Sequence, residues 1–163
     1  PAVFSETGTH RGECRYRRTE NGLVIETHNF GIKGFPVTDK KSGFATSIIA
    51  YDRFYRLISL EVFDHHGSPI GINGTRLSKQ TITYDGCGRI GEVRFFAVDG
   101  KALCEDGTAG FRFSYFDDHV DVTALNMEWE GVYTKKVSLE EGIAFSRKYM
   151  QKYSAKISNP YMK

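Results

Sequence analysis

Residues Tyr51–Gly71 read YDRFYRLISLEVFDHHGSPIG, a succession of strand, tight turn, strand and second turn. Within this stretch, Leu57–Phe63 alternates apolar and polar side chains, which predicts a strand with one buried and one solvated face. Tyr51-Asp52 leads into the first turn, and His66-Gly67 closes the second. Aspartate accepts hydrogen bonds from its own backbone in such turns, and glycine adopts positive φ without steric cost. The stretch therefore predicts β-hairpin pairing, which needs neighbouring strands to be stable in water.

The same pattern returns along the chain with a period of 33 residues. Each copy has a phenylalanine followed four residues later by a glycine, at Phe30/Gly34, Phe63/Gly67 and Phe96/Gly100. An aromatic–aspartate pair precedes the other turn, at Tyr51-Asp52, Tyr84-Asp85 and, one residue short of the period, Phe116-Asp117. Several residue types kept in one register indicate an internal repeat. Its copies span residues 10–40, 41–72, 73–105 and 106–134, and the first and last are the most degraded.

The repeat predicts a mainly β protein, an antiparallel meander of about seven or eight strands built from 33-residue hairpins. We expect the sheet to be twisted or curled into a half-barrel, with a closed barrel as the rival geometry. At 163 residues the chain is expected to form one domain, 1–163, with its hairpin repeats at 10–134. The sequence Glu20-Asn21-Gly22 predicts a type I′ turn, with Asn and Gly both left-handed.

The pattern changes at residue 138. Ser138-Leu139-Glu140-Glu141 is a capping-box sequence, with serine at the N-cap and glutamate three residues later. One helical stripe follows, formed by Leu139, Ile143, Met150 and Tyr153 with Ala144 and Ser146 between them. We expect a helix over about 138–157, ended by Asn159-Pro160, that covers the sheet or its open end. Gly142 should weaken this helix by up to ~1 kcal/mol relative to alanine.

Composition limits the classes of partner. The net charge of +2 does not predict a polyanionic partner, so nucleic acid is not expected. Residues 135–163 carry seven Lys and Arg against two Glu, so this basic end could touch phosphate or anionic lipid, or form a solvated helix face. The sequence has no apolar run of about 18 residues, so no membrane-spanning segment is predicted. Cys14, Cys87 and Cys104 are expected to be reduced thiols in or near the core, with a bridge between the last two as the alternative.

Asp64-His65-His66 is the most visible cluster of metal-binding side chains. Adjacent residues on a strand point to opposite faces, so one of these histidines could bind a metal only with distant partners such as His119 or Asp121. A polar turn with solvated imidazoles explains the same residues, because the next copy has Ala97-Val98-Asp99 in their place. Scattered turn aspartates could supply Ca²⁺ ligands, but they lack the spacing of an EF-hand. No metal or cofactor is therefore predicted.

No catalytic residue is predicted either. Cys87 between two glycines could expose a nucleophilic thiol at a tight turn. Its repeat equivalent is Phe54, which favours an apolar contact at this position. The chain has no Gly-x-Ser-x-Gly sequence, no P-loop and no dinucleotide fingerprint in a strand-to-helix setting.

Exposed aromatic side chains on a sheet can form a flat surface for sugars or peptides. The candidates for such a ligand-binding surface are Phe54, Tyr55, Tyr115, Phe116 and Trp129. The alternative is that these rings belong to the core, as most strand aromatics do. An edge strand could also accept a strand of a partner.

The aromatic–aspartate turns, with their Gly-x-Pro-like closures, resemble the tyrosine–aspartate class of β-hairpin repeats of bacterial surface and secreted proteins. The resemblance covers about residues 41–120. In that family the repeats mostly form scaffolds and binding surfaces. The resemblance therefore implies a secreted or surface-associated protein and brings no catalytic residue with it.

These observations predict a non-enzymatic binding or scaffold domain that presents a sheet face or edge to a protein or glycan partner. The alternative is a hydrolase or metal-dependent enzyme with a site around His65, His66 and His119. A third possibility is a fragment of a longer repeat array. Stoichiometric Zn²⁺ or Ca²⁺ in the purified protein would favour the enzyme.

Overall fold

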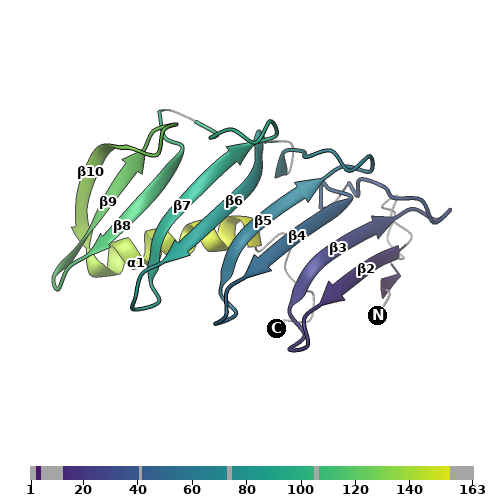
Figure 1. The fold of residues 1–163 in the computed structure, drawn as a ribbon, viewed down its shortest axis with the longest axis horizontal. Helices are drawn as coiled ribbons and strands as arrows, with labels where there is room; N and C mark the ends of the chain where they lie inside the picture. The colour runs from purple at the N-terminus through teal and green to yellow at the C-terminus, as the bar shows by residue number, and fades with distance from the viewer. Residues whose placement is uncertain (1–2, 5–12, 41, 73–74, 105–106, 155–163) are drawn as a thin grey trace. The chain divides into compact units, whose positions relative to one another are not determined.

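A computed structural model describes the backbone of residues 3–4, 13–40, 42–72, 75–104 and 107–154, and the side chains of these ranges from residue 13 to residue 147 (Figure 1). The predicted mainly β antiparallel meander with a single C-terminal helix is confirmed. The chain divides into two compact units, residues 1–79 and 80–163. This boundary falls inside strand β6, and the organisation of 1–163 as one domain stays a prediction.

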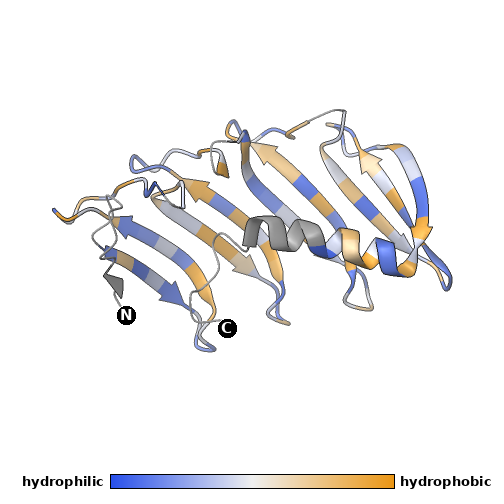
Figure 2. Cartoon of the chain, turned by 180° about the vertical axis from the view of Figure 1, so that it is seen from behind, coloured by the Kyte–Doolittle hydropathy of each residue, from blue (hydrophilic) through white to orange (hydrophobic). Residues whose placement is uncertain are grey.

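In the first unit, the described strands before β6 are β1 (Val3–Phe4), β2 (Glu13–Arg18), β3 (Val24–Phe30), β4 (Thr46–Tyr51) and β5 (Leu57–Phe63). Sheet order is chain order, and all described pairs are antiparallel. Thr27, Ser47 and Val62 lie side by side on the buried face. Their neighbours Glu26 and Glu61 lie on the other face. Hydrophilic and hydrophobic residues alternate along several strands of the sheet (Figure 2).

In the second unit, β6 (Leu77–Tyr84) is followed by β7 (Ile90–Ala97), β8 (Gly110–Tyr115), β9 (His119–Leu125), β10 (Gly131–Ser138) and α1 (Leu139–Ser154). Phe113 pairs with Val122 on the buried face, and Arg112 pairs with Thr123 on the opposite face. Sheet order again follows chain order. No described pairing joins the first and last strands of either unit, so neither unit closes into a barrel.

The turns confirm the 33-residue register. At one end of the strands, the backbone N–H of one residue donates to the carbonyl oxygen of the residue four positions later. These bonds are Thr19→Leu23 (2.9 Å), Asp52→Arg56 (2.9 Å) and Asp85→Arg89 (2.8 Å). At the other end of the strands, the same bond forms in Gly31→Phe35 (2.8 Å), Asp64→Ser68 (2.9 Å) and Ala97→Lys101 (2.8 Å). Single β-bridges at Phe30–Pro36, Phe63–Pro69 and Phe96–Ala102 keep the same spacing. The copies therefore repeat their hydrogen bonding as well as their residue types.

The turn after β2 differs from its prediction. Gly22 N–H donates to Thr19 O at 3.0 Å, and Gly22 has a φ of 82°. Asn21 is outside the positive-φ region, and the pairing register shifts between Arg17 and Arg18. These are the features of a three-residue loop, a type I turn followed by one left-handed residue. The predicted type I′ turn is wrong, because that turn needs a two-residue loop with both residues left-handed.

Helix α1 begins at the predicted capping box. The Ser138 N–H donates to Glu141 Oε2 at 3.1 Å, and the Glu141 N–H donates to Ser138 Oγ at 3.2 Å. Two otherwise unpaired donors of the first turn are thereby satisfied. The predicted end of the helix near residue 157 and its stop at Asn159-Pro160 lie outside the described residues.

The buried face of α1 is rotated from the predicted stripe. Gly142 and Ser146 are buried, whereas Ile143 is 37% exposed and Ala144 is exposed. An alanine Cβ at position 142 would lie 2.6 Å from Val120 Cβ, so the helix approaches β9 at the glycine. The prediction that Ile143 and Ala144 lie on the packed side is wrong because this close approach turns them outward. The side chains of Met150 and Tyr153 lie outside the described residues.

Aromatic packing joins α1 to the sheet of the second unit. The Phe145 ring lies 5.2 Å from that of Phe111 and 6.1 Å from that of Phe113, measured between ring centroids. Phe111 and Phe113 lie on the same face of β8, two residues apart. The helix therefore covers the buried face of the last strands, as was predicted for a cap of the repeat array.

Candidate functional site

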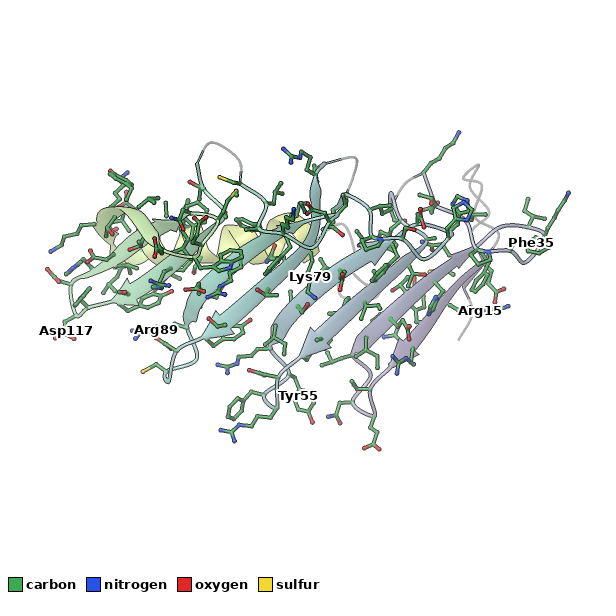
Figure 3. The ribbon with its side chains drawn as sticks, turned by 45° about the horizontal axis from the view of Figure 1, so that its top comes forward. Arg15, Phe35, Tyr55, Lys79, Arg89 and Asp117 are labelled. Carbon is green, nitrogen blue, oxygen red and sulfur yellow. The ribbon has the colours of Figure 1, made fainter. Side chains whose placement is uncertain are left out.

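The turn between β4 and β5 presents two exposed aromatic side chains. Phe54 is 60% exposed and Tyr55 is 56% exposed. The guanidinium carbons of Arg53 and Arg56 lie 4.7 and 5.1 Å from the centroid of the Phe54 ring. Figure 3 shows Tyr55 at the tip of this turn. The side-chain amide of Asn21, on the neighbouring turn, donates to the Tyr55 hydroxyl.

Tyr55 occupies a backbone conformation that normally favours glycine. Its φ is 62°, while the equivalent positions of the neighbouring copies hold Gly22 and Gly88, with φ of 82° in each case. Trp129 has a φ of 66° at the corresponding place in the β9–β10 turn. A bulky side chain in this region carries strain of order 1–2 kcal/mol. Two of the predicted binding residues therefore stand on strained backbone.

The structure separates the predicted aromatic set. Within the second unit, Tyr115 and Phe116 lie at the β8–β9 turn, and Trp129 lies at the opposite end of β9. The Arg89 guanidinium carbon is 4.2 Å from the centroid of the Tyr115 ring. Phe116 stacks on His119, with centroids 4.5 Å apart. Phe54 and Tyr55 belong to the first unit, so each unit carries its own aromatic sites.

Trp129 belongs to a polar and aromatic cluster on the solvated face of the second unit. Its ring lies 5.2 Å from the Phe96 ring, and the Arg94 guanidinium carbon lies 4.7 Å from its centroid. Glu92 forms an ion pair with Arg94 and another with Arg112, whose Nη2 lies 2.8 Å from Glu92 Oε2. Glu92 thus holds both arginines beside the tryptophan.

His65, His66 and His119 lie at or beside turns and do not form a shared site among the described residues. His65 and His66 are exposed on the turn after β5, with ring centroids 3.8 Å apart. His119 contacts Asp118 through Nδ1, and its Nε2 lies 3.6 Å from Asp121 Oδ1. Among the residues whose placement is described, no group of three or more His, Cys, Asp and Glu side chains could hold a metal ion.

Asp64 anchors the histidine turn. Its Oδ1 accepts the N–H of Ser68 at 2.9 Å and that of His66 at 2.8 Å. These two bonds, the Ser68 bond first, hold the pKa of Asp64 below its ordinary value. This carboxylate therefore stabilises the fold above its unfolded-state pKa, and the contribution is lost as the pH falls through the lowered folded-state pKa.

Replacing Asp64 with asparagine should flatten the acid dependence of stability. The amide oxygen still accepts both N–H groups, but the side chain no longer titrates. Denaturant unfolding from neutral pH down to about pH 2 should show a smaller loss for Asp64→Asn than for the unchanged chain, with the difference confined below about pH 4. Identical pH profiles would contradict the anchoring role of the carboxylate.

The three cysteines are free thiols, and Cys14 is buried, as predicted for reduced thiols in or near the core; Cys87 departs from that prediction because it lies on a turn. Cys87 is exposed on the β6–β7 turn. Its repeat equivalent Phe54 is exposed as well. The expectation that this position makes an apolar contact is therefore wrong, because it lies at the tip of a three-residue loop in both copies.

Strand β10 is the open edge of the second unit. It pairs with β9 and with no other strand in the described part of the chain. All eight of its residues except Val137 are exposed, and Val132 and Tyr133 are each more than half exposed. Lys135 and Lys136 stand at its centre, on alternate faces. An eight-residue edge of this kind offers unpaired backbone groups to another chain.

The register shows which residues of β10 face the open edge. The Phe116 N–H donates to His119 O at 2.9 Å, so His119 and every second residue of β9 after it bond to β8. The residues between them, such as Val122, bond to β10, where Val122 pairs with Lys135. Lys135 therefore directs its backbone N–H and C=O toward β9, and Thr134 directs its own toward the open edge.

Sequence reasoning missed one exposed tip. Ile32, on the turn between β3 and Pro36, is 90% exposed, and Phe35 is 70% exposed. The 33-residue repeat could have predicted the exposure of Ile32, because it aligns Ile32 with turn residues of the other copies. The equivalents of Ile32 in the next copies are His65 and Val98, and the turn is the same in all three.

Two comparisons of the sequence with known proteins found no match. No protein-family model matches this chain, and no curated protein sequence matches it either. Among the described helices, none has the length and apolar character needed to cross a membrane. The function is therefore inferred from the geometry of the chain itself.

Proposed function

We propose that this chain is a non-enzymatic binding module that accepts an extended segment of a partner protein as an extra strand beside β10. The observation that carries the proposal is the open edge of β10, eight residues long and solvent-exposed along almost its whole length. Edge strands of globular proteins are commonly short, covered or interrupted. The register of β10 shifts between Gly131 and Tyr133 and is regular from there to Ser138, and a regular edge of this length suits strand addition, in which backbone hydrogen bonds supply affinity.

The lysines of β10 favour an acidic partner. Lys135 and Lys136 lie on the two faces of the strand, so an added strand meets a positive charge on either side. A second copy of β10 would bring like charges together, which disfavours self-pairing. Lys136 already lies 3.9 Å from Asp118, an exposed pair that contributes little and leaves the lysine accessible. A partner segment with Glu or Asp at alternating positions presents its carboxylates on one face, where they meet one of the two lysines in either register.

The remainder of the described fold supports a scaffold role. The turn aspartates are engaged by their own turns, as Asp52 accepts the N–H of Phe54 at 2.8 Å and that of Arg56 at 3.0 Å. Asp85 makes the matching bonds to Cys87 and Arg89. We include in this proposal the resemblance to tyrosine–aspartate repeats, which the repeated aspartate-anchored turns support. Nothing in the arrangement of His65, His66 and His119 favours the hydrolase alternative.

A proline at position 134 tests the proposal. Thr134 directs its N–H to the open edge, so Thr134→Pro removes a donor that a partner strand needs and keeps the β9–β10 ladder. The probe is a synthetic ten-residue peptide of alternating glutamate and valine, followed by fluorescence anisotropy. The unchanged chain should bind it, and Thr134→Pro should weaken binding by about tenfold or more.

Thr134→Val is the matched control. It loses the bond between the Thr134 and Thr123 hydroxyls (2.9 Å) but retains the backbone N–H, so it should bind as the unchanged chain does. Circular dichroism of each variant checks that the sheet is intact. Peptide binding that Thr134→Pro leaves unchanged would overturn the proposal, as would the absence of any binding by the unchanged chain.

A further inference from the structure

The turn that follows β3 carries the two most exposed large apolar side chains among the described residues of the first unit. The Gly31 N–H donates to Phe35 O at 2.8 Å, and the Gly34 N–H donates to Gly31 O at 2.8 Å. Ile32 and Phe35 stand outside these bonds, and the exposed Lys33 lies between them in the chain. Figure 3 shows Phe35 on a projecting loop, and Tyr55 lies at the opposite end of the strands of this unit.

The fold does not require apolar residues at this tip. The same turn in the second copy runs from Asp64 to Ser68, with the same two backbone hydrogen bonds at 2.9 and 3.1 Å. Its tip carries His65 and His66, which are polar. Gly34 and Gly67 have nearly equal φ angles, 79° and 80°. The apolar pair of the first copy thus contributes nothing that the turn needs, and its exposure needs an external explanation.

We infer that this tip docks on an anionic lipid surface, with Ile32 and Phe35 entering the headgroup region and Lys33 remaining at the level of the phosphates. A dry protein pocket that enclosed both apolar side chains would also strip water from Lys33, which is costly for an unpaired ammonium group. A lipid interface avoids this cost, because a lysine stem extends along apolar surface while its charge stays hydrated.

Charge in the first unit matches the inferred surface. Residues 1–79 carry eleven Lys and Arg against eight Asp and Glu. Lys33 lies on the turn and Lys40 follows Phe35 by five positions in the chain; both are exposed, and no carboxylate of the described residues forms an ion pair with either. Basic residues beside an anionic bilayer add to the affinity, and their contribution falls with salt. Two inserted side chains with this charge should give reversible, salt-sensitive binding.

The test measures binding of the whole chain to lipid vesicles by flotation. One set of vesicles is phosphatidylcholine alone, and the other is an equal mixture of phosphatidylcholine and phosphatidylserine. The unchanged chain should float with the mixed vesicles and much less with the neutral ones. The double variant Ile32→Ser, Phe35→Ser should lower the bound fraction by about tenfold or more, because both insertions are lost.

Val98→Ser is the matched control, since Val98 occupies the Ile32 position in the third copy and is also exposed. It should bind the mixed vesicles as the unchanged chain does. Lys33→Glu should reduce binding to the mixed vesicles alone. Failure of the unchanged chain to float, or full binding by the double serine variant, would overturn the inference. Thr134 belongs to the second unit, and Ile32 and Phe35 belong to the first. The outcome of the vesicle experiment therefore does not decide the outcome of the peptide-binding experiment.

Discussion

Replacing Gly110 with alanine should lower the free energy of unfolding by about 3 kcal/mol. Gly110 is buried at the start of β8, where it pairs with Arg94 on one side and Leu125 on the other. An added Cβ would lie 2.4 Å from the Val93 carbonyl oxygen and 3.3 Å from the Arg94 Cα. Both are backbone atoms inside the sheet, so relief requires separation of β7 from β8.

Gly86→Ala is the matched control for this change. Gly86 lies on the exposed β6–β7 turn, outside the positive-φ region, and no atom lies within 4 Å of its added Cβ. The control should change stability by less than about 0.5 kcal/mol. Urea unfolding monitored by circular dichroism compares the two midpoints. Equal midpoints for Gly110→Ala and the unchanged chain would contradict the close approach of β7 and β8.

Gly142→Ala should destabilise the chain by about 2 kcal/mol, although alanine is the better helix former by about 1 kcal/mol. The added Cβ would lie 2.6 Å from both Cβ and Cγ2 of Val120 and 3.1 Å from its Cγ1. Val120 is fully buried in β9 and has no space to retreat. The clash therefore outweighs the helix propensity, and α1 has to move away from the sheet.

Ala144→Gly separates the two effects. Ala144 is exposed on α1, so its replacement removes helix propensity alone and should cost about 1 kcal/mol. Thermal unfolding of both variants should show Gly142→Ala as the less stable. A rise in the melting temperature for Gly142→Ala would show that the helix does not rest on Val120.

Many local features could be predicted from residue order. The turns at Asp52 and Asp85 were predicted from the repeated aromatic–aspartate pair, because their hydrogen bonds join residues at most four positions apart. The capping box of Ser138 and Glu141 has the same local character. The type I′ prediction failed at Asn21 because Asn-Gly is compatible with two loop lengths, and the Thr19–Leu23 hydrogen bond selected the longer one.

The candidate site could be predicted only in part. The exposed rings of Phe54 and Tyr55 were among the predicted residues, but the strained backbone of Tyr55 was not foreseen, since the equivalent positions hold glycine. Trp129 was grouped with Tyr115, and β9 places the two at opposite ends. Ile32 was overlooked because an apolar residue near a strand end resembles core in a single sequence.

Residue order alone carried the period, the hairpins and the start of the helix, because each of these depends on bonds between near neighbours in the chain. Tertiary packing assigned the open edge to β10, the buried face of α1 to Gly142, and the close approach of β7 to Gly110. These features depend on distances between segments that are remote in sequence. Glycines with quite different surroundings, such as Gly86 and Gly110, are identical until the strands are paired.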